Sequence, residues 1–163
     1  MSIEESNKAT IQRFNAEVIN AGHMEVADEI LDPELRHVRG ALAKSLSILK
    51  GKSSAQPDKP SQALTNIERF KQTALELHSG FPDWNSIIDE QMAVGETVMT
   101  RYTVQGTHTR DFLGIPPTGR RIDVAEVVLF RFVNGKIREI WAIGDELGLL
   151  RQLGVTELPQ LGS

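Results

Sequence analysis

The segment VLFRFVNGKIREIWAI, from Val128 to Ile143, places an Asn-Gly pair between two runs rich in β-branched and aromatic residues. An Asn-Gly pair in this setting is the strongest short-range signal for a β-hairpin, because both residues tolerate the positive φ angles of a two-residue turn. We therefore predict that strands 121–133 and 136–143 are antiparallel neighbours, joined at Asn134 and Gly135. This hairpin constrains the rest of the fold.

The alternating pattern extends upstream, and a second turn at Gly95-Glu96 predicts strands 84–94 and 97–108. Before residue 84 the apolar period is helical. One helix carries Ile11, Phe14 and Val18 on one face, with Ser6 or Asn7 as its cap, and further helices are expected at 24–31 and 63–78, with a short strand at 35–38. Helices followed by a β-meander indicate an α+β fold, a curved antiparallel sheet with the helices packed on its concave side and one pocket between them.

The bulk composition is that of an ordinary globular protein. A length of 163 residues suits a single domain spanning 1–163, in which the Gly-, Ser- and Pro-rich segment 44–62 is expected to be a mobile loop. A net charge of −4 gives no electrostatic reason to expect nucleic acid or an anionic membrane as a partner. The acidic N-terminus does not resemble a signal peptide and the chain has no cysteine, so we expect a cytoplasmic protein.

Carboxylates on the last two strands are the first candidates for chemistry. Strict alternation puts Glu126 on the same face as Phe130, and puts Glu139 and Asp145 on the same face as Trp141. A carboxylate surrounded by apolar side chains has its pKa raised by desolvation, which suits general acid/base catalysis near neutral pH. Two alternatives remain open: Glu139 reaches a cross-strand arginine, and Asp145 caps the helix predicted at 146–153.

Histidines are the second set of candidates. His108 shares the parity of Tyr102, so both are expected to face inward on strand 97–108, although a hydrogen-bonded structural histidine is the alternative. His78 ends a predicted helix, where a positive charge is favourable. His37 is undecided. The histidines show no paired spacing typical of metal ligands, so a metal site is not expected.

Several motifs together resemble one known family. GTHTRDFLGIPPTGRR at 106–121, FRFVNGKIREIWAIGDELGLLRQLG at 130–154 and, further upstream, FPDW and NAGHMEVADEILDPELRH are similar to the SnoaL-like polyketide cyclases, also described as predicted ester cyclases. The resemblance implies the cone-shaped α+β fold of the NTF2-like superfamily. The chain departs from the family pattern in the length of segment 44–62 and in Arg36, which precedes His37 where relatives often have an acidic residue.

The resemblance also implies an activity. Members of the family close a ring by intramolecular aldol condensation of a polyketide ester, without metal or cofactor. Their acid/base is an aspartate near the end of the last strand, which matches Asp145, and an assisting histidine is assigned here to His108. Residues expected around a small hydrophobic carbonyl ligand are Glu126, Trp141, Tyr102, Glu139, His78 and Phe130. Relatives commonly pair through the outer face of the sheet, where Arg131, Arg138 and Ile140 are expected, so a homodimer or higher homo-oligomer is predicted.

Three rival functions are weighed against the cyclase. An epoxide hydrolase of the same superfamily needs an arginine flanked by carboxylates, but Thr103 follows Arg101 and Arg101 has the opposite parity to Tyr102. An isomerase needs a tyrosine beside an acid, a role open to Tyr102. A non-catalytic binding or dimerisation module would use Asp145 only as a helix cap. The cyclase hypothesis predicts that Asp145→Asn folds normally but loses turnover.

Overall fold

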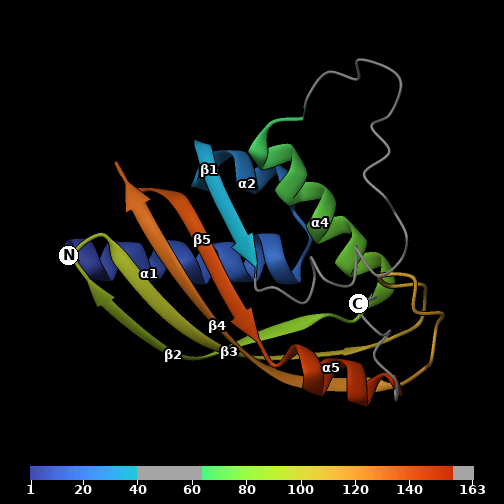
Figure 1. The fold of residues 1–163 in the computed structure, drawn as a ribbon. Helices are drawn as coiled ribbons and strands as arrows, with labels where there is room; N and C mark the ends of the chain where they lie inside the picture. The colour runs from blue at the N-terminus through green and yellow to red at the C-terminus, as the bar shows by residue number, and fades with distance from the viewer. Residues whose placement is uncertain (40–63, 156–163) are drawn as a thin grey trace, which may run out of the picture.

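The computed structural model describes residues 1–39 and 64–155. The loop predicted at 44–62 lies outside these ranges. In the described part, helices pack against one side of a curved sheet, and the sheet bends around them to form a cone-like shell (Figure 1). The predicted α+β class with N-terminal helices on the concave side of the sheet is confirmed.

The N-terminal region forms a helical pair. Helix α1 (Ile3–Arg13) continues into the wider π-type helix η1 (Phe14–Asn20), and Gly22, at φ 77°, allows the turn into α2 (Met24–Ile30). The predicted apolar face is buried, but the cap is Ser2 rather than Ser6 or Asn7. Ser2 and Glu5 form a reciprocal capping box that extends the helix by one turn.

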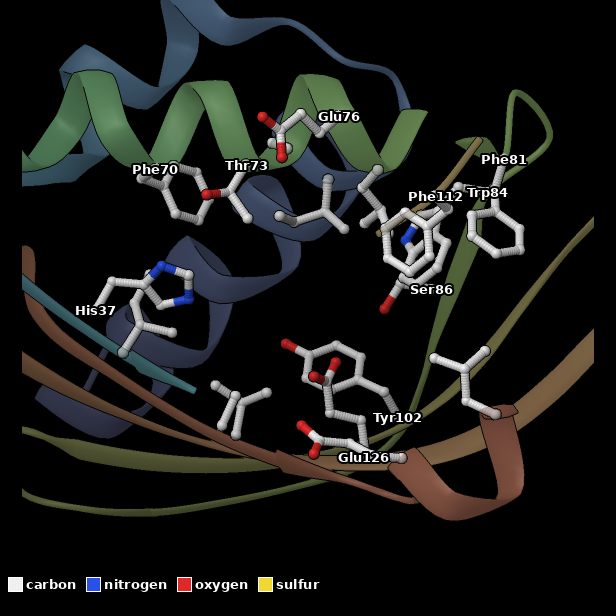
Figure 2. Close-up of a pocket in the computed structure, with 18 of the residues that line it drawn as sticks. His37, Phe70, Thr73, Glu76, Phe81, Trp84, Ser86, Tyr102, Phe112 and Glu126 are labelled. Carbon is white, nitrogen blue, oxygen red and sulfur yellow. The ribbon is translucent and has the colours of Figure 1, made fainter. Parts of the chain in front are cut away.

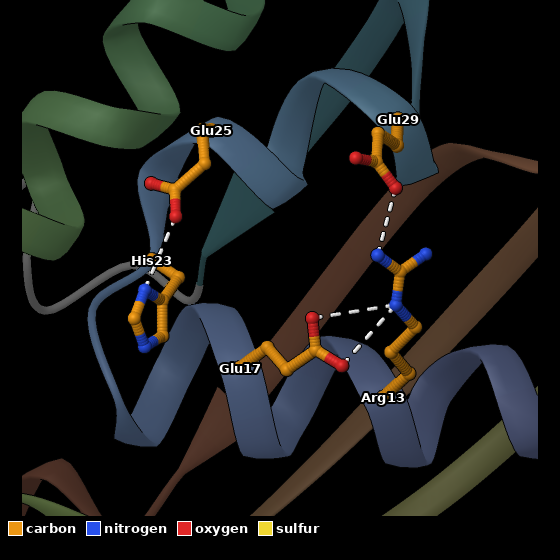
Figure 3. Close-up of polar contacts among 5 residues, drawn as sticks. All are labelled: Arg13, Glu17, His23, Glu25 and Glu29. Atoms are coloured by element: carbon orange, nitrogen blue, oxygen red, sulfur yellow. Dashed lines mark hydrogen bonds and ion pairs between the residues drawn. The ribbon is translucent and has the colours of Figure 1, made fainter.

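Ionic contacts tie this helical pair together on its solvent side (Figure 3). Arg13 contacts Glu17 one turn along at 3.2 Å and reaches Glu29 of α2 at 2.7 Å, while His23 Nδ1 lies 3.1 Å from Glu25. All five side chains are substantially exposed and solvent screens their charges, so these contacts contribute little to stability. The helices are positioned mainly by their buried apolar faces.

The described residues form one sheet with the strand order β1-β5-β4-β3-β2. Its strands are β1 (Leu31–Arg39), β2 (Asn85–Val94), β3 (Thr97–Thr107), β4 (Arg121–Val133) and β5 (Lys136–Gly144). The predicted meander of the last four strands is confirmed. The expectation of a purely antiparallel sheet is wrong, because β1 pairs with β5 in parallel and makes the sheet mixed.

The β4–β5 hairpin contains one extra residue on β5. Phe132 pairs with Ile137, as the Asn-Gly turn dictates, but Arg131 pairs with Glu139. Arg138 is therefore a β-bulge, an inserted residue without a partner on the neighbouring strand. Because side chains alternate with a period of two, this insertion moves every later residue of β5 to the opposite face.

The bulge overturns the predicted orientation of the last strand. Beyond it, Ile140 and Ala142 are buried, whereas Trp141 is 41% exposed and Asp145 is also exposed. The expectation that Glu139, Trp141 and Asp145 face the interior is wrong. The expectation that Ile140 lies on the outer face is wrong for the same reason.

Two further helices complete the shell around the interior. Helix α4 (Asn66–Gly80) begins at the capping box of Thr65 and Glu68 and packs beside β1, and α5 (Glu146–Gln152) follows β5 and contacts β4. The main core lies between the sheet and the helices, and a smaller core surrounds Phe81 and Leu153. Within the described ranges, no helix has both the length and the apolar character needed to cross a bilayer.

Candidate active site

A cavity of about 230 Å³ lies between the concave face of the sheet and helices η1, α4 and α5 (Figure 2). Most of its wall is apolar. Its polar or charged lining comes from a small set of side chains: Asn15, His37, Thr73, Glu76, Trp84, Ser86, Tyr102, Glu126 and Glu146. An apolar pocket with a few convergent polar groups is the usual form of a small-molecule site.

The floor of the cavity carries an acid and a phenol side by side. Tyr102 on β3 pairs directly with Glu126 on β4, and both side chains line the cavity (Figure 2). Directly opposed residues have Cβ atoms about 4.5–5.5 Å apart, so the two functional groups can act on one ligand atom or on adjacent ones. Val128 and Phe130 continue the same face of β4 and make the adjoining floor apolar.

Burial controls the protonation of the phenol. Tyr102 is 4% exposed, and desolvation raises its pKa well above the usual value of 10, with the nearby charge of Glu126 adding to the effect. A hydrogen bond with Thr100 partly opposes the shift. Tyr102 therefore remains a neutral hydrogen-bond donor throughout the physiological pH range.

His37 faces the cavity from β1. Its ring packs edge-on against Phe70 of α4 with the centroids 5.4 Å apart, and it lines the wall between the sheet and that helix (Figure 2). All four histidines of the chain are in the described ranges, and His37 is the one that lines the cavity. Its ring nitrogens can donate or accept a proton at the end of the cavity that lies away from Phe81.

The opposite end of the cavity is aromatic. Phe81, fully buried, contacts Trp84 and Phe112 in edge-to-face geometry, with ring centroids 5.9 Å and 5.1 Å away. Phe112, Leu113 and Ile115 come from the connection between β3 and β4, so this connection closes the end of the pocket. The arrangement suits the flat face of an aromatic or polyene ligand.

Asp145 occupies a different environment from the one predicted. Its carboxylate caps α5 by accepting a 2.8 Å hydrogen bond from the Gly148 amide, and it is absent from the residues that line the cavity. A Cβ atom added at Gly148 would clash with this carboxylate, so the cap and the glycine are matched to each other. The capping alternative is confirmed, and the prediction that Asp145 lies in the pocket is wrong.

This geometry reverses the expectation for the Asp145 variants. Asp145→Asn should retain both the fold and turnover, because asparagine caps a helix about as well as aspartate. Asp145→Ala should lose roughly 1 kcal/mol of stability and still turn over substrate. Urea unfolding and a turnover assay of the two variants test this; loss of turnover in Asp145→Asn with an intact fold would restore Asp145 as the acid/base.

The two other predicted histidines are structural. His108 is fully buried, stacks on Phe81 with the centroids 5.2 Å apart, and its Nδ1 lies 3.0 Å from the Thr118 hydroxyl. His78 Nε2 lies 2.8 Å from the Ile19 carbonyl oxygen, which it can contact as a donor. The predicted inward orientation of His108 is confirmed, as is its alternative of a hydrogen-bonded structural histidine. Neither histidine lines the cavity, so the expectation that His108 and His78 contact the ligand is wrong.

Glu139 and its neighbours lie on the outer face. Glu139 contacts Arg131 at 3.3 Å and Arg36 at 3.5 Å, which confirms the alternative of a cross-strand arginine. Arg101 is also on the outer face, where it contacts Asp89 at 3.2 Å. Among the described residues no arginine lines the cavity, so the arginine flanked by carboxylates that an epoxide hydrolase needs is not assembled there.

Sequence reasoning found part of the cavity lining and missed the rest. Glu126, Tyr102 and Phe130 were predicted from alternation and do line it. His37 and Ser86 were missed as site residues. Strand alternation gave a signal for Ser86, because it lies two residues before Ile88 and shares its inward face. The position of His37 depends on the parallel pairing of β1 with β5, which no local pattern indicates.

Comparison with known proteins decides the family. The model of the SnoaL-like polyketide cyclases matches residues 52–153, more than half of the chain. The chain belongs to the SnoaL-like polyketide cyclase family. The resemblance predicted from the PTGR and GKI segments is confirmed. The matched region includes β2 to β5 and α5, and therefore both Tyr102 and Glu126.

Curated relatives of this SnoaL-like chain are distant. It is 40% identical over 60 residues to the aklanonic acid methyl ester cyclase DnrD of Streptomyces peucetius, covering 37% of this chain and 41% of that protein. It is 42% identical over 60 residues to a nogalonic acid methyl ester cyclase of Streptomyces nogalater, covering 37% and 45%. The chain thus matches less than half the length of these relatives.

Solved structures support the fold over nearly the whole SnoaL-like chain. TsrD from Streptomyces laurentii superposes with a TM-score of 0.72 at 26% identity, covering 93% of this chain and 96% of that one. IdmH from Streptomyces antibioticus superposes with a TM-score of 0.71 at 27% identity, covering 91% and 99%. The predicted SnoaL/NTF2-like fold is confirmed.

Proposed function

We propose that the protein is a cyclase that closes a ring in a small hydrophobic carbonyl compound by an intramolecular aldol reaction, with Glu126 as the general base and Tyr102 as the hydrogen-bond donor. The observation that carries the proposal is the pairing of this carboxylate and this phenol on the floor of an otherwise apolar cavity. Distant similarity to methyl ester cyclases of aklanonic and nogalonic acid supports the same reaction class.

The chemistry requires one proton to be removed and one to be delivered. The Glu126 carboxylate takes a proton from the carbon between two carbonyl groups, and the resulting enolate carbon forms a bond to a ketone carbon of the same molecule. The C=O π bond breaks, and its oxygen becomes an alkoxide that receives a proton. The product is an isomer of the substrate, so the overall reaction is redox-neutral.

Tyr102 and His37 have complementary roles in this proposal. Tyr102 donates a hydrogen bond to an oxygen as negative charge develops on it, and because burial holds its pKa above 10 the phenol does not lose its proton in the working range. His37, on the β1 side of the cavity, gives a proton to the alkoxide. It then regains a proton from solvent while the protonated Glu126 returns one to solvent, so both groups are restored for the next turnover. His37 replaces His108 as the assisting histidine.

An isomerase is the second candidate that a specific observation favours. The same Tyr102–Glu126 pair could remove a proton beside a ketone and return it at another carbon, with the phenol stabilising the intermediate enolate. The two reactions differ in their product. Ring closure consumes a ketone and forms a new C–C bond, whereas isomerisation only moves a double bond.

Incubation with aklanonic acid methyl ester and nogalonic acid methyl ester tests the proposal. The expected result is a product of unchanged mass that elutes separately and has lost one ketone carbon signal in its ¹³C spectrum. A product that keeps its ketone and has a shifted double bond would favour the isomerase. If neither ester reacts, and neither exchanges the hydrogen between its carbonyl groups with solvent deuterium, the binding-module alternative becomes the better account.

Assembly and location stay predictions. A homodimer through the outer face of the sheet would cover Trp141 and Ile143, both of which are substantially exposed in the single chain. A cytoplasmic location is likewise an expectation from the sequence.

A further inference from the structure

Trp84 carries a buried hydrogen-bond donor that the proposed mechanism does not use. Its indole Nε1 is inaccessible to solvent and has no hydrogen-bond partner among the described residues, although Trp84 lines the cavity. Nearly all buried donors in folded proteins are bonded, because a buried donor without a partner destabilises the fold. Because the nitrogen has almost no accessible surface in this structure, a ligand atom reaches it only when neighbouring side chains shift, and the hydrogen bond that the donor then gains favours that shift.

The surrounding structure holds the Trp84 indole in place. The backbone amide of Trp84 donates to the Phe81 carbonyl at 3.0 Å, and the Phe81 ring packs against the indole. The preceding residue, Asp83, accepts hydrogen bonds from the Thr107 amide and hydroxyl at 2.6 Å and 2.7 Å, and these bonds lower its pKa. The segment is thus fixed to the end of β3.

Ser86 supplies a second polar group beside this indole. It lines the cavity two residues further along, is 5% exposed, and its side chain lies on the cavity side near Trp84 (Figure 2). Its backbone is held by Asn20 and Asn15, whose side chains accept from its amide at 2.7 Å and donate to its carbonyl at 2.8 Å. The hydroxyl of Ser86 can donate or accept a hydrogen bond.

The strand register sets the distance between this pair and the catalytic floor. Ser86 pairs with Val104, which is two residues from Tyr102 on the same strand. Diagonal neighbours of this kind have side chains about 7–8 Å apart. A ligand that reaches Tyr102 with one oxygen can therefore reach Trp84 and Ser86 with another oxygen a few bonds away.

We propose that Trp84 Nε1–H and Ser86 Oγ form a second anchor, which binds a ketone, quinone or phenol oxygen on the aromatic part of the ligand. The inference deepens the proposed function, because it assigns the residues that orient the unreactive end of the same substrate. Phe81 and Phe112 give this end an aromatic wall, and the anchor selects an oxygenated ring over a plain hydrocarbon of the same shape.

The chain has two tryptophans, Trp84 and Trp141, so indole N–H resonances in a ¹H–¹⁵N spectrum provide a direct test. The probes are 9-fluorenone and fluorene, a matched aromatic pair with and without a carbonyl oxygen. Neither can undergo the proposed reaction, so this test does not depend on turnover. Fluorenone should shift the Trp84 indole proton downfield, as expected for a new hydrogen bond, while fluorene should not. Trp141, on the outer face, serves as the internal reference.

Variants of Trp84 and Ser86 test how much the anchor contributes to the binding affinity for each probe. Trp84→Phe, which also assigns the resonance, should weaken fluorenone binding about 3- to 10-fold and leave fluorene binding within about twofold. Ser86→Ala should weaken fluorenone in the same direction while retaining the Trp84 resonance. The proposal is overturned if fluorenone does not bind, if both probes shift the Trp84 resonance alike, or if Trp84→Phe weakens both probes equally. A positive result without ester turnover would separate this anchor from the catalytic proposal.

Discussion

Glu126→Gln is expected to lower kcat about 10²- to 10⁴-fold while leaving the fold intact, because the amide cannot take a proton from the substrate and the loss of a general base has effects of this size. Glutamine has nearly the same shape as glutamate, so substrate binding should change much less than kcat. The measurement is steady-state turnover of aklanonic or nogalonic acid methyl ester, whichever reacts, with circular dichroism to confirm folding.

Glu139→Gln is the matched control for this variant. Glu139 is a carboxylate on the neighbouring strand, but it lies on the outer face and contacts Arg131 and Arg36 there. We expect unchanged turnover and a stability loss below about 1 kcal/mol, as for other partly exposed ion pairs. Wild-type kcat in Glu126→Gln, or an equal loss in both variants, would remove Glu126 as the base.

Phe81→Ala is expected to cause the largest loss of stability, about 3–5 kcal/mol. Phe81 is fully buried where α4 meets the end of the sheet, and its ring contacts Trp84, His108 and Phe112. Alanine would leave a void among these three rings that they cannot fill together. Thermal unfolding should show a decrease in Tm on the order of 10 °C.

The control for Phe81→Ala is Leu75→Ala on the outer side of α4. Leu75 is 55% exposed, so its truncation should cost less than about 0.5 kcal/mol. Urea unfolding of both variants gives the free energies of unfolding, and an unchanged slope would show that the denatured state is not altered. A loss of less than 1 kcal/mol in Phe81→Ala would contradict the packing described at the aromatic end of the cavity.

Much of the fold could be predicted from local sequence. The Asn134-Gly135 turn and the alternation around it specify the β4–β5 hairpin, and the apolar spacing of Ile11, Phe14 and Val18 specifies the buried face of the first helices. Glu126 and Tyr102 could be placed in the cavity because β3 and β4 pair without interruption from Thr97 to Thr107. For these strands, local alternation and the final geometry agree.

The orientation of β5 could not be predicted, because it depends on a contact between distant segments. The inserted residue Arg138 contacts Asp32 at 2.8 Å and Glu34 at 2.6 Å, both on β1. The parallel pairing of β1 with β5 brings these acidic residues to the bulge, and nothing within the hairpin itself indicates an extra residue. The same parallel pairing carries His37 to the cavity wall.

The position of a bound substrate tests the central claim most directly. We propose crystallising Glu126→Gln, which should bind without turning over, with aklanonic acid methyl ester. The expected structure has the ligand in the cavity between the sheet and α4, with one ketone oxygen about 3 Å from the Tyr102 hydroxyl and an activated carbon facing residue 126. A ligand bound on the outer face, beside Trp141 and Asp145, would contradict the account.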